Sequence, residues 1–138
     1  MIDEYLKTNA SFLRLYKEYH EYKSLIIAVD FDNTLYDFHK KGEHYLQVMK
    51  LLDNLRDIGC TIIIWTANRD IEFVKKYLYS YDVHYDFINE DAPVMQMYFK
   101  GEPARKIFAN AYIDDRSGLK QVYEELSLLI SLVQKEIK

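Results

Sequence analysis

Four aspartates of the sequence stand where two apolar runs end: Asp30, Asp32, Asp114 and Asp115. The first pair directly follows the apolar run 25–29, and the second pair follows a later one. In an extended segment, Asp30 and Asp32 point to the same side, because successive side chains alternate in direction. Two carboxylates that face one reaction centre can divide the work of catalysis: one attacks as the nucleophile, and the other carries a proton to the leaving group.

A third apolar run, 61–65, ends in the polar segment 66–69, which reads Thr-Ala-Asn-Arg. If the three runs are parallel strands of one sheet, their polar ends meet at one edge of it. Four carboxylates that converge there repel one another unless a cation or protons intervene. Because the ligands are all oxygen atoms, with no His or Cys nearby, the group suits a hard ion, above all Mg²⁺. The sequence therefore predicts a Mg²⁺ site formed by the four aspartates.

The elements that must position these residues follow from the periodicity of the apolar side chains. Helical spacing predicts helices, and short continuous apolar runs predict strands that are buried on both faces. The expected helices span 2–20, 43–58 (ended by Gly59), 70–81 and 118–137, and the expected strands span 25–29, 61–65, 85–88 and 109–113. Strands that alternate with helices imply a parallel sheet. We therefore expect an α/β fold: a three-layer, doubly wound, Rossmann-like and mostly parallel sheet with helices on both faces.

The length of 138 residues predicts a single domain. Within it, we expect 1–22 to form an N-terminal helix packed on the core, 35–44 to form a flap, and 89–105 to form an irregular loop. The formal net charge of −4 argues against a nucleic-acid partner. The single cysteine excludes an internal disulfide and a cysteine-rich zinc site. No apolar run approaches the roughly 18 residues of a membrane span, and we expect a cytoplasmic protein.

The order of these motifs resembles that of the haloacid dehalogenase (HAD) superfamily. The resemblance rests on Asp30-x-Asp32-x-Thr34 after one hydrophobic strand, Thr66 after a second strand, a lysine, and the pair at 114–115 after a later strand. It covers residues 25–116, which is most of the chain. Three motifs in this order, each at the end of an apolar strand, argue against a chance match.

The resemblance implies a Mg²⁺-dependent phosphatase that acts through an aspartyl-phosphate. Asp30 would be the nucleophile and a metal ligand, and Asp32 would be the general acid and base, with its backbone carbonyl as a further ligand. An aspartate at this second position is typical of members that transfer phosphate to water or alcohols, which favours a phosphatase over a dehalogenase or a P-type ATPase. Thr66 would bind a phosphoryl oxygen, Asp114 would bind Mg²⁺ directly, and Asp115 would assist directly or through water.

The family also uses a lysine that stabilises the charge of the transferring phosphoryl group. Lys106 precedes the last predicted strand, and we assign this role to it, with Lys100 as the alternative. The predicted catalytic residues are then Asp30, Asp32, Thr66 and Lys106. Asn68 and Arg69 would bind the phosphate together with Thr66 and Lys106.

Relatives of this kind often carry a cap domain that closes over the site and selects the substrate. Here only 35–42 separate the first motif from the next helix, and only 89–105 remain between the second and third motifs, so we expect no cap. Substrate selection would then fall to 36–44 and 89–105. The expected partner is a phosphorylated substrate, a small molecule in preference to a macromolecule, and the sequence leaves a homo-oligomer open.

Several alternatives stay open at this point. A catalytically idle member of the superfamily would serve as a binding or scaffold module, and a nucleic-acid end-processing phosphatase would use the same chemistry on another substrate. Thr66 could instead cap the helix that follows it, and the pair Asp114-Asp115 could be one that a helix dipole favours. A signalling receiver domain is set aside, because its phosphorylated aspartate follows the third strand and none closes the strand predicted at 85–88.

Overall fold

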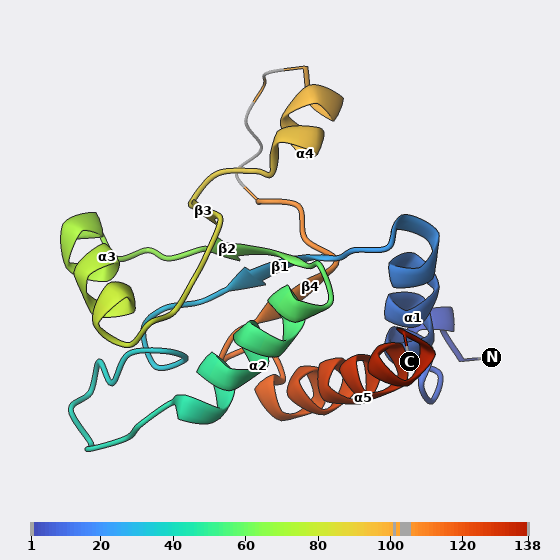
Figure 1. The fold of residues 1–138 in the computed structure, drawn as a ribbon, viewed down its shortest axis with the longest axis horizontal. Helices are drawn as coiled ribbons and strands as arrows, with labels where there is room; N and C mark the ends of the chain where they lie inside the picture. Colours follow the sequence, from blue (N-terminus) through green and yellow to red (C-terminus); the bar gives the residue numbers. More distant parts are fainter. Residues whose placement is uncertain (1, 101, 103–105, 138) are drawn as a thin grey trace.

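The computed structural model describes residues 2–100, 102 and 106–137. In chain order its elements are a 3₁₀ turn (Glu4–Leu6), α1 (Ala10–Tyr22), β1 (Ile26–Val29), α2 (Leu46–Asp57), β2 (Thr61–Ile64), α3 (Ile71–Ser80), β3 (Phe87–Ile88), α4 (Pro93–Tyr98), β4 (Ala111–Ile113) and α5 (Leu119–Ile137). The four strands form one sheet in the order β3-β2-β1-β4, and every strand pair is parallel (Figure 1). The predicted α/β class with a parallel sheet is confirmed. None of the described helices has the length and apolar character needed to cross a membrane.

The observed elements depart from the predicted ones in two places. The helix expected over 2–20 is divided, because the 3₁₀ turn ends before α1 and the residue before α1, Asn9, has a left-handed φ of 63°. The segment 89–105, expected to be irregular, contains α4. Pro93 is the first residue of this helix, where the missing N–H of proline has no helical partner to lose. Residues 101 and 103–105 lie outside the described part of the chain.

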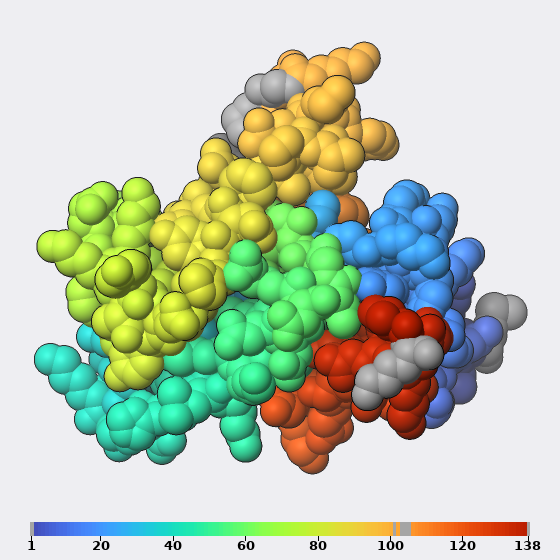
Figure 2. Space-filling model, in the orientation of Figure 1, coloured from blue at the N-terminus to red at the C-terminus, as the bar shows by residue number. Residues whose placement is uncertain are grey.

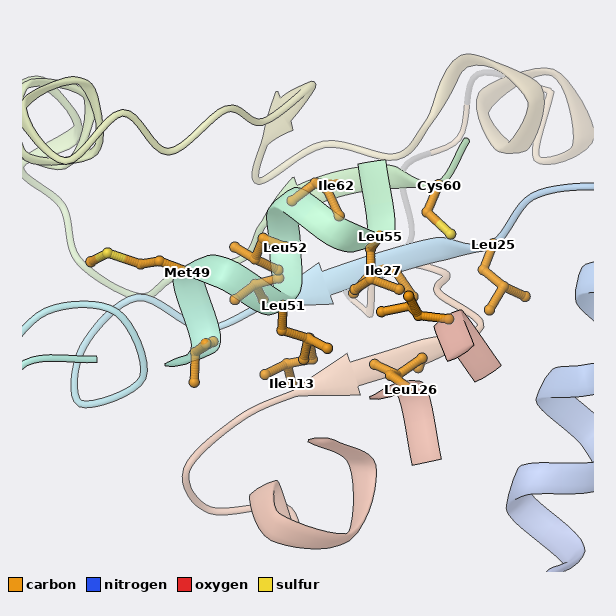
Figure 3. Close-up of a cluster of buried hydrophobic side chains, with 14 of the residues drawn as sticks. Leu25, Ile27, Met49, Leu51, Leu52, Leu55, Cys60, Ile62, Ile113 and Leu126 are labelled. Atoms are coloured by element: carbon orange, nitrogen blue, oxygen red, sulfur yellow. The ribbon is translucent and has the colours of Figure 1, made fainter. Parts of the chain in front are cut away.

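Helices α1, α2, α3 and α5 and one face of the sheet contribute buried side chains to the main core. Figure 3 shows the part of it between α2, α5 and the strands. Ile27 of β1 pairs in register with Ile62 of β2, and both side chains are fully buried. Leu55 of α2 and Leu126 of α5 pack into the same cluster. After α2, Gly59 turns the chain toward β2 with a φ of 90°, a conformation that favours glycine. The prediction that this glycine ends the helix is confirmed.

The opposite face of the sheet has a much thinner cover. Ile63 forms a small buried cluster there with Ala92 and Ile107. Both of these covering residues belong to the crossover between β3 and β4, whose helix α4 has no buried residue and stands out from the body (Figures 1 and 2). The expected layers of helices on both faces are therefore present only in part, because the one helix described in this crossover, α4, buries none of its side chains against the sheet.

Side chains tie the edge strand β4 to β1 and α1. The side-chain oxygen of Asn110 accepts the backbone N–H of Ile26 at 2.6 Å, and the backbone N–H of Asn110 donates to the Ile26 carbonyl at 2.7 Å. From α1, Arg14 donates to the Asn110 carbonyl at 2.9 Å, and Glu18 accepts from the Asn110 amide at 2.9 Å. These contacts align the amino ends of β1 and β4, so that their carboxyl ends also come together.

Candidate metal and phosphate site

Three of the four predicted carboxylates meet at the carboxyl ends of β1 and β4. One carboxylate oxygen from each of Asp30, Asp114 and Asp115 lies within 4.8 Å of the other two. The backbone N–H of Asp30 donates to the Ile113 carbonyl at 2.9 Å, which continues the pairing of β1 with β4 past the last strand residues. The carboxylate of Asp32 does not belong to this group, and it lies 3.5 Å from the side-chain amide of Asn68.

The turn after β1 is anchored by Phe31, whose side chain is fully buried. Its ring stacks on the ring of Tyr36, with centres 5.3 Å apart, and its carbonyl accepts the N–H of Tyr36 at 3.0 Å. Asn33 closes the turn with a left-handed φ of 61°, which asparagine tolerates better than most residues. Because the residue between them is fixed in the core, Asp30 and Asp32 are both held on the outer side of the turn.

Thr34 joins the first and third motifs, a role that the sequence did not reveal. Its side chain is fully buried, and its hydroxyl oxygen accepts the backbone N–H of Asp115 at 3.1 Å. The same oxygen lies 3.3 Å from a carboxylate oxygen of Asp30 and 3.3 Å from one of Asp115. The single hydroxyl proton can go to either carboxylate. Thr34 therefore fixes how closely the two acidic groups approach.

The carboxylates of this group repel one another when no cation lies between them. Burial raises the pKa of Asp30 to about 7, and a hydrogen bond shared with Asp115 and the charge of Asp114 add to this rise. A divalent cation would replace the shared proton and offset most of the negative charge of the three carboxylates. Three converging carboxylates form a donor set of oxygen atoms alone, which fits Mg²⁺.

The second motif places a threonine hydroxyl at the same edge of the sheet. Thr66 is largely buried, and its hydroxyl oxygen accepts the N–H of Asn68 at 3.0 Å, so that the hydroxyl keeps its own proton for a second bond. The side chain of Asn89 holds the backbone of Thr66 from both sides, at 2.8 Å to its N–H and 3.0 Å to its carbonyl. The N-cap of α3 is Asp70, which accepts the N–H of Phe73 at 3.1 Å. Thr66 therefore does not cap that helix.

The remaining predicted residues follow the ends of β2 and β4. The side-chain amide of Asn68 lies 3.5 Å from a carboxylate oxygen of Asp32 and so links the first two motifs. Arg69 is exposed beside them. The carboxylate of Asp114 accepts the N–H of Arg116 at 2.9 Å, and α5 begins at Leu119. The acidic pair thus lies in the turn before α5, not in the first turn of the helix.

A cavity of about 520 Å³ opens beside the acidic group and includes Lys106 in its wall. Asp30 and Asp114 line the same cavity. The ammonium group of Lys106 lies 5.1 Å from the centre of the Tyr112 ring. Lys100 follows α4 and is not among the described residues that line this space. Of the two lysines, the geometry therefore favours Lys106.

No protein-family model matches this sequence, and no curated protein matches it. A solved structure of a conserved protein from Bacteroides thetaiotaomicron has a similar fold, with a TM-score of 0.60 and 23% sequence identity. The match covers 76% of this chain and 91% of that one. At this level of identity the likeness shows the fold alone, and it agrees with a Rossmann-like arrangement of the sheet.

We expect Mg²⁺ to raise the Tm of the protein. An ion that binds the folded state alone stabilises it by about 2.7 kcal/mol when its free concentration is about a hundredfold above the Kd, or roughly 5–10 °C for a domain of this size. Differential scanning fluorimetry with and without Mg²⁺ measures the shift. Asp114→Asn should abolish it, and the matched control Asp57→Asn, at the exposed end of α2, should keep it. A full shift in Asp114→Asn would place the ion elsewhere.

Proposed function

We propose that this chain is a Mg²⁺-dependent phosphomonoester hydrolase of the HAD type. The observation that carries the proposal is the meeting of Asp30, Asp114 and Asp115 at the ends of adjacent parallel strands, within 4.8 Å of one another. Burial, followed by the neighbouring carboxylates, raises the pKa of Asp30, and a bound cation would favour its ionised form. We assign the phosphoryl oxygens to Lys106, which lines the same cavity as Asp30, and to the hydroxyl of Thr66, which follows the neighbouring strand β2.

In the first step of the proposed reaction, a carboxylate oxygen of Asp30 attacks the phosphorus atom, and the bond between phosphorus and the ester oxygen breaks. The leaving oxygen takes a proton from the carboxyl group of Asp32. The amide of Asn68, 3.5 Å from Asp32, orients that carboxyl group. The products of this step are the free alcohol and a phosphoryl group bonded to Asp30.

In the second step, Asp32 acts as a base, because it has given up its proton. It removes a proton from a water molecule, whose oxygen attacks phosphorus, and the bond between phosphorus and Asp30 breaks. Inorganic phosphate leaves, and both carboxyl groups return to their starting states. Thr66 and Lys106 bind the non-bridging oxygens throughout. Mg²⁺, when held by Asp30 and the pair at 114–115, neutralises the negative charge of the phosphoryl group.

We also propose that the site works without a cap domain. The segment 35–44 is a small closed loop, because the carboxylate of Asp37 accepts the N–H groups of Lys41 (3.0 Å), Gly42 (2.7 Å) and Glu43 (3.1 Å). These N–H groups, with that of Lys41 first, hold the pKa of Asp37 below its ordinary value. At the other insertion point, the described residues contribute the single short helix α4.

The test is phosphate release from a panel of phosphate monoesters, with Mg²⁺ and with a chelator. We expect release that depends on Mg²⁺, that Lys106→Met lowers by about 10²-fold or more, and that the matched control Lys100→Met leaves unchanged. Equal release with the chelator would overturn the role of the metal. No release from any compound would overturn the proposed hydrolase and favour the idle binding module.

A further inference from the structure

One face of the sheet carries an aromatic pair that residues 2–100, 102 and 106–137 leave partly uncovered. The crossover between β3 and β4 buries Ala92 and Ile107 against this face, but its helix α4 contributes no buried side chain. Trp65 and Tyr112 stand on the same face, each half-buried, with ring centres 5.6 Å apart and planes at 50°. Between them on the sheet, Ala28, which pairs in register with Tyr112, adds only a methyl group and is itself buried. All three residues line the cavity of about 520 Å³.

The register of the strands places this pair next to the proposed nucleophile. The N–H of Trp65 donates to the Val29 carbonyl at 2.8 Å, and the N–H of Asp30 donates to the Ile113 carbonyl at 2.9 Å. These bonds bring Trp65, Asp30 and Asp114 side by side on three adjacent chain segments. Their side chains point to the same face, because directions alternate along each strand. Trp65 and Tyr112, which we call the aromatic wall, therefore line the same cavity as Asp30 and Asp114.

The aromatic wall is fixed in place and lies beside a cation. The hydroxyl of Tyr112 donates to the Ile107 carbonyl, which holds the ring against the crossover segment. The ammonium group of Lys106 lies 5.1 Å from the centre of that ring. A ligand that matches this wall has a planar ring to pack on the aromatic faces and an anionic group to reach the cation.

We propose that the site selects small phosphate monoesters whose leaving group carries a planar aromatic ring, and that Trp65 and Tyr112 bind this ring. This inference rests on the proposed function. The cavity has the size of an ordinary small-molecule site, which is about 300–1,000 Å³. The ring can be bonded directly to the ester oxygen, as in an aryl phosphate, or can be separated from it by a sugar, as in a nucleoside 5′-monophosphate. The shared chemistry is the ring, and the binding test distinguishes its two sources.

The test uses the fluorescence of Trp65, which is the one tryptophan of the sequence. Phenylphosphonate and propylphosphonate carry the same charged group, and neither has an ester bond to hydrolyse. With Mg²⁺ present, we expect phenylphosphonate to change the Trp65 emission and to bind about tenfold more tightly than propylphosphonate. A nucleoside 5′-monophosphate tests the second source of the ring. It and phenylphosphonate are both titrated into the Asp30→Asn protein, and the tighter of the two aromatic ligands in that protein identifies the source.

Variants separate a binding role of the ring from a structural one. Tyr112→Leu should abolish the tenfold preference for phenylphosphonate and leave the affinity for propylphosphonate unchanged. Tyr112→Phe keeps the ring and should keep the preference, so it controls for any loss of folding in the leucine variant. Tyr79→Leu, at an exposed position of α3, is the matched aromatic control and should behave as the wild type.

The outcomes distinguish this inference from the proposed function on which it rests. Equal affinities for the two phosphonates, with Mg²⁺-dependent phosphate release intact, would overturn the aromatic preference and leave the hydrolase standing. No binding of either phosphonate, together with no phosphate release from any substrate, would overturn both.

Discussion

Asp30→Asn should reduce phosphate release by at least about 10⁴-fold, because the amide cannot attack phosphorus and the covalent intermediate cannot form. Steady-state release with Mg²⁺ measures the effect. The side chain keeps its size, so the fold should survive, and the far-ultraviolet circular dichroism spectrum should match that of the wild type. A variant that kept wild-type activity would show that Asp30 is not the nucleophile.

The same variant should change how the stability of the metal-free protein depends on pH. The pKa of Asp30 rises from its ordinary 3.8 to about 7 in the folded protein, so the folded state binds this proton more tightly than the unfolded state. The stability that this proton contributes is present in full below pH 3.8 and is lost as the pH rises to about 7. Asp30→Asn has no such proton to lose. With a chelator present, the Tm of Asp30→Asn minus the Tm of the wild type should therefore increase as the pH rises from 4 to 7.

Asp32→Ala should lower turnover by about 10²–10⁴-fold, the usual contribution of a general acid and base. The carboxylate of Asp32 lies outside the group of Asp30, Asp114 and Asp115, so the variant should keep the increase in Tm that Mg²⁺ produces. The measurement is kcat beside the thermal shift on the same preparation. For a substrate with a good leaving group, the substitution should slow the first step less, because the leaving oxygen needs no proton to depart.

A near-normal kcat in Asp32→Ala would assign proton transfer to another group. A loss of the Mg²⁺ shift would instead make Asp32 a metal-binding residue through its side chain. Asp70→Ala is a useful comparison, because Asp70 caps α3 near the same edge of the sheet. Asp70→Ala should lower the free energy of unfolding by about 1 kcal/mol and should have no specific effect on proton transfer.

The positions of the acidic motifs could be predicted from the sequence because they depend on short-range patterns. An apolar run such as 61–65 reads as a buried strand wherever it lies in the chain, and polar residues that follow parallel strands must share an edge of the sheet. Helical spacing likewise predicted α2, α3 and α5 to within a few residues. These signals are local, and no other part of the chain overrides them.

Thr34 and Asn89 could not be assigned in this way, because their roles depend on contacts between distant segments. Thr34 meets Asp115 only after β1 and β4 pair, and Asn89 meets Thr66 only after β3 joins β2. Threonine and asparagine are common in turns for local reasons, so their residue types alone carry little information. The one available signal was the position of Thr34 at the end of the first acidic motif.

The thin cover on one face of the sheet could not be predicted from the periodicity of the sequence either. The pattern of the strands shows that both faces carry apolar side chains, and it therefore predicts cover on both. Whether the crossover 89–110 covers the second face depends on the path of the chain. The apolar side chains of this segment show too little periodicity to predict that path. Trp65 and Tyr112 consequently read as ordinary core residues in the sequence, and only the fold shows that they border a cavity beside Asp30.

The most direct test of the account is to trap the phosphoryl group on Asp30. Asp32→Asn removes the base that activates water, so an aryl phosphate with a good leaving group should phosphorylate this variant faster than water can release the group. The protein is quenched in acid, digested, and analysed by mass spectrometry. We predict one phosphoryl group on the peptide that contains Asp30, present with Mg²⁺ and absent with a chelator. Phosphate release by the wild type with no phosphoryl group on that peptide in the variant would contradict the covalent mechanism.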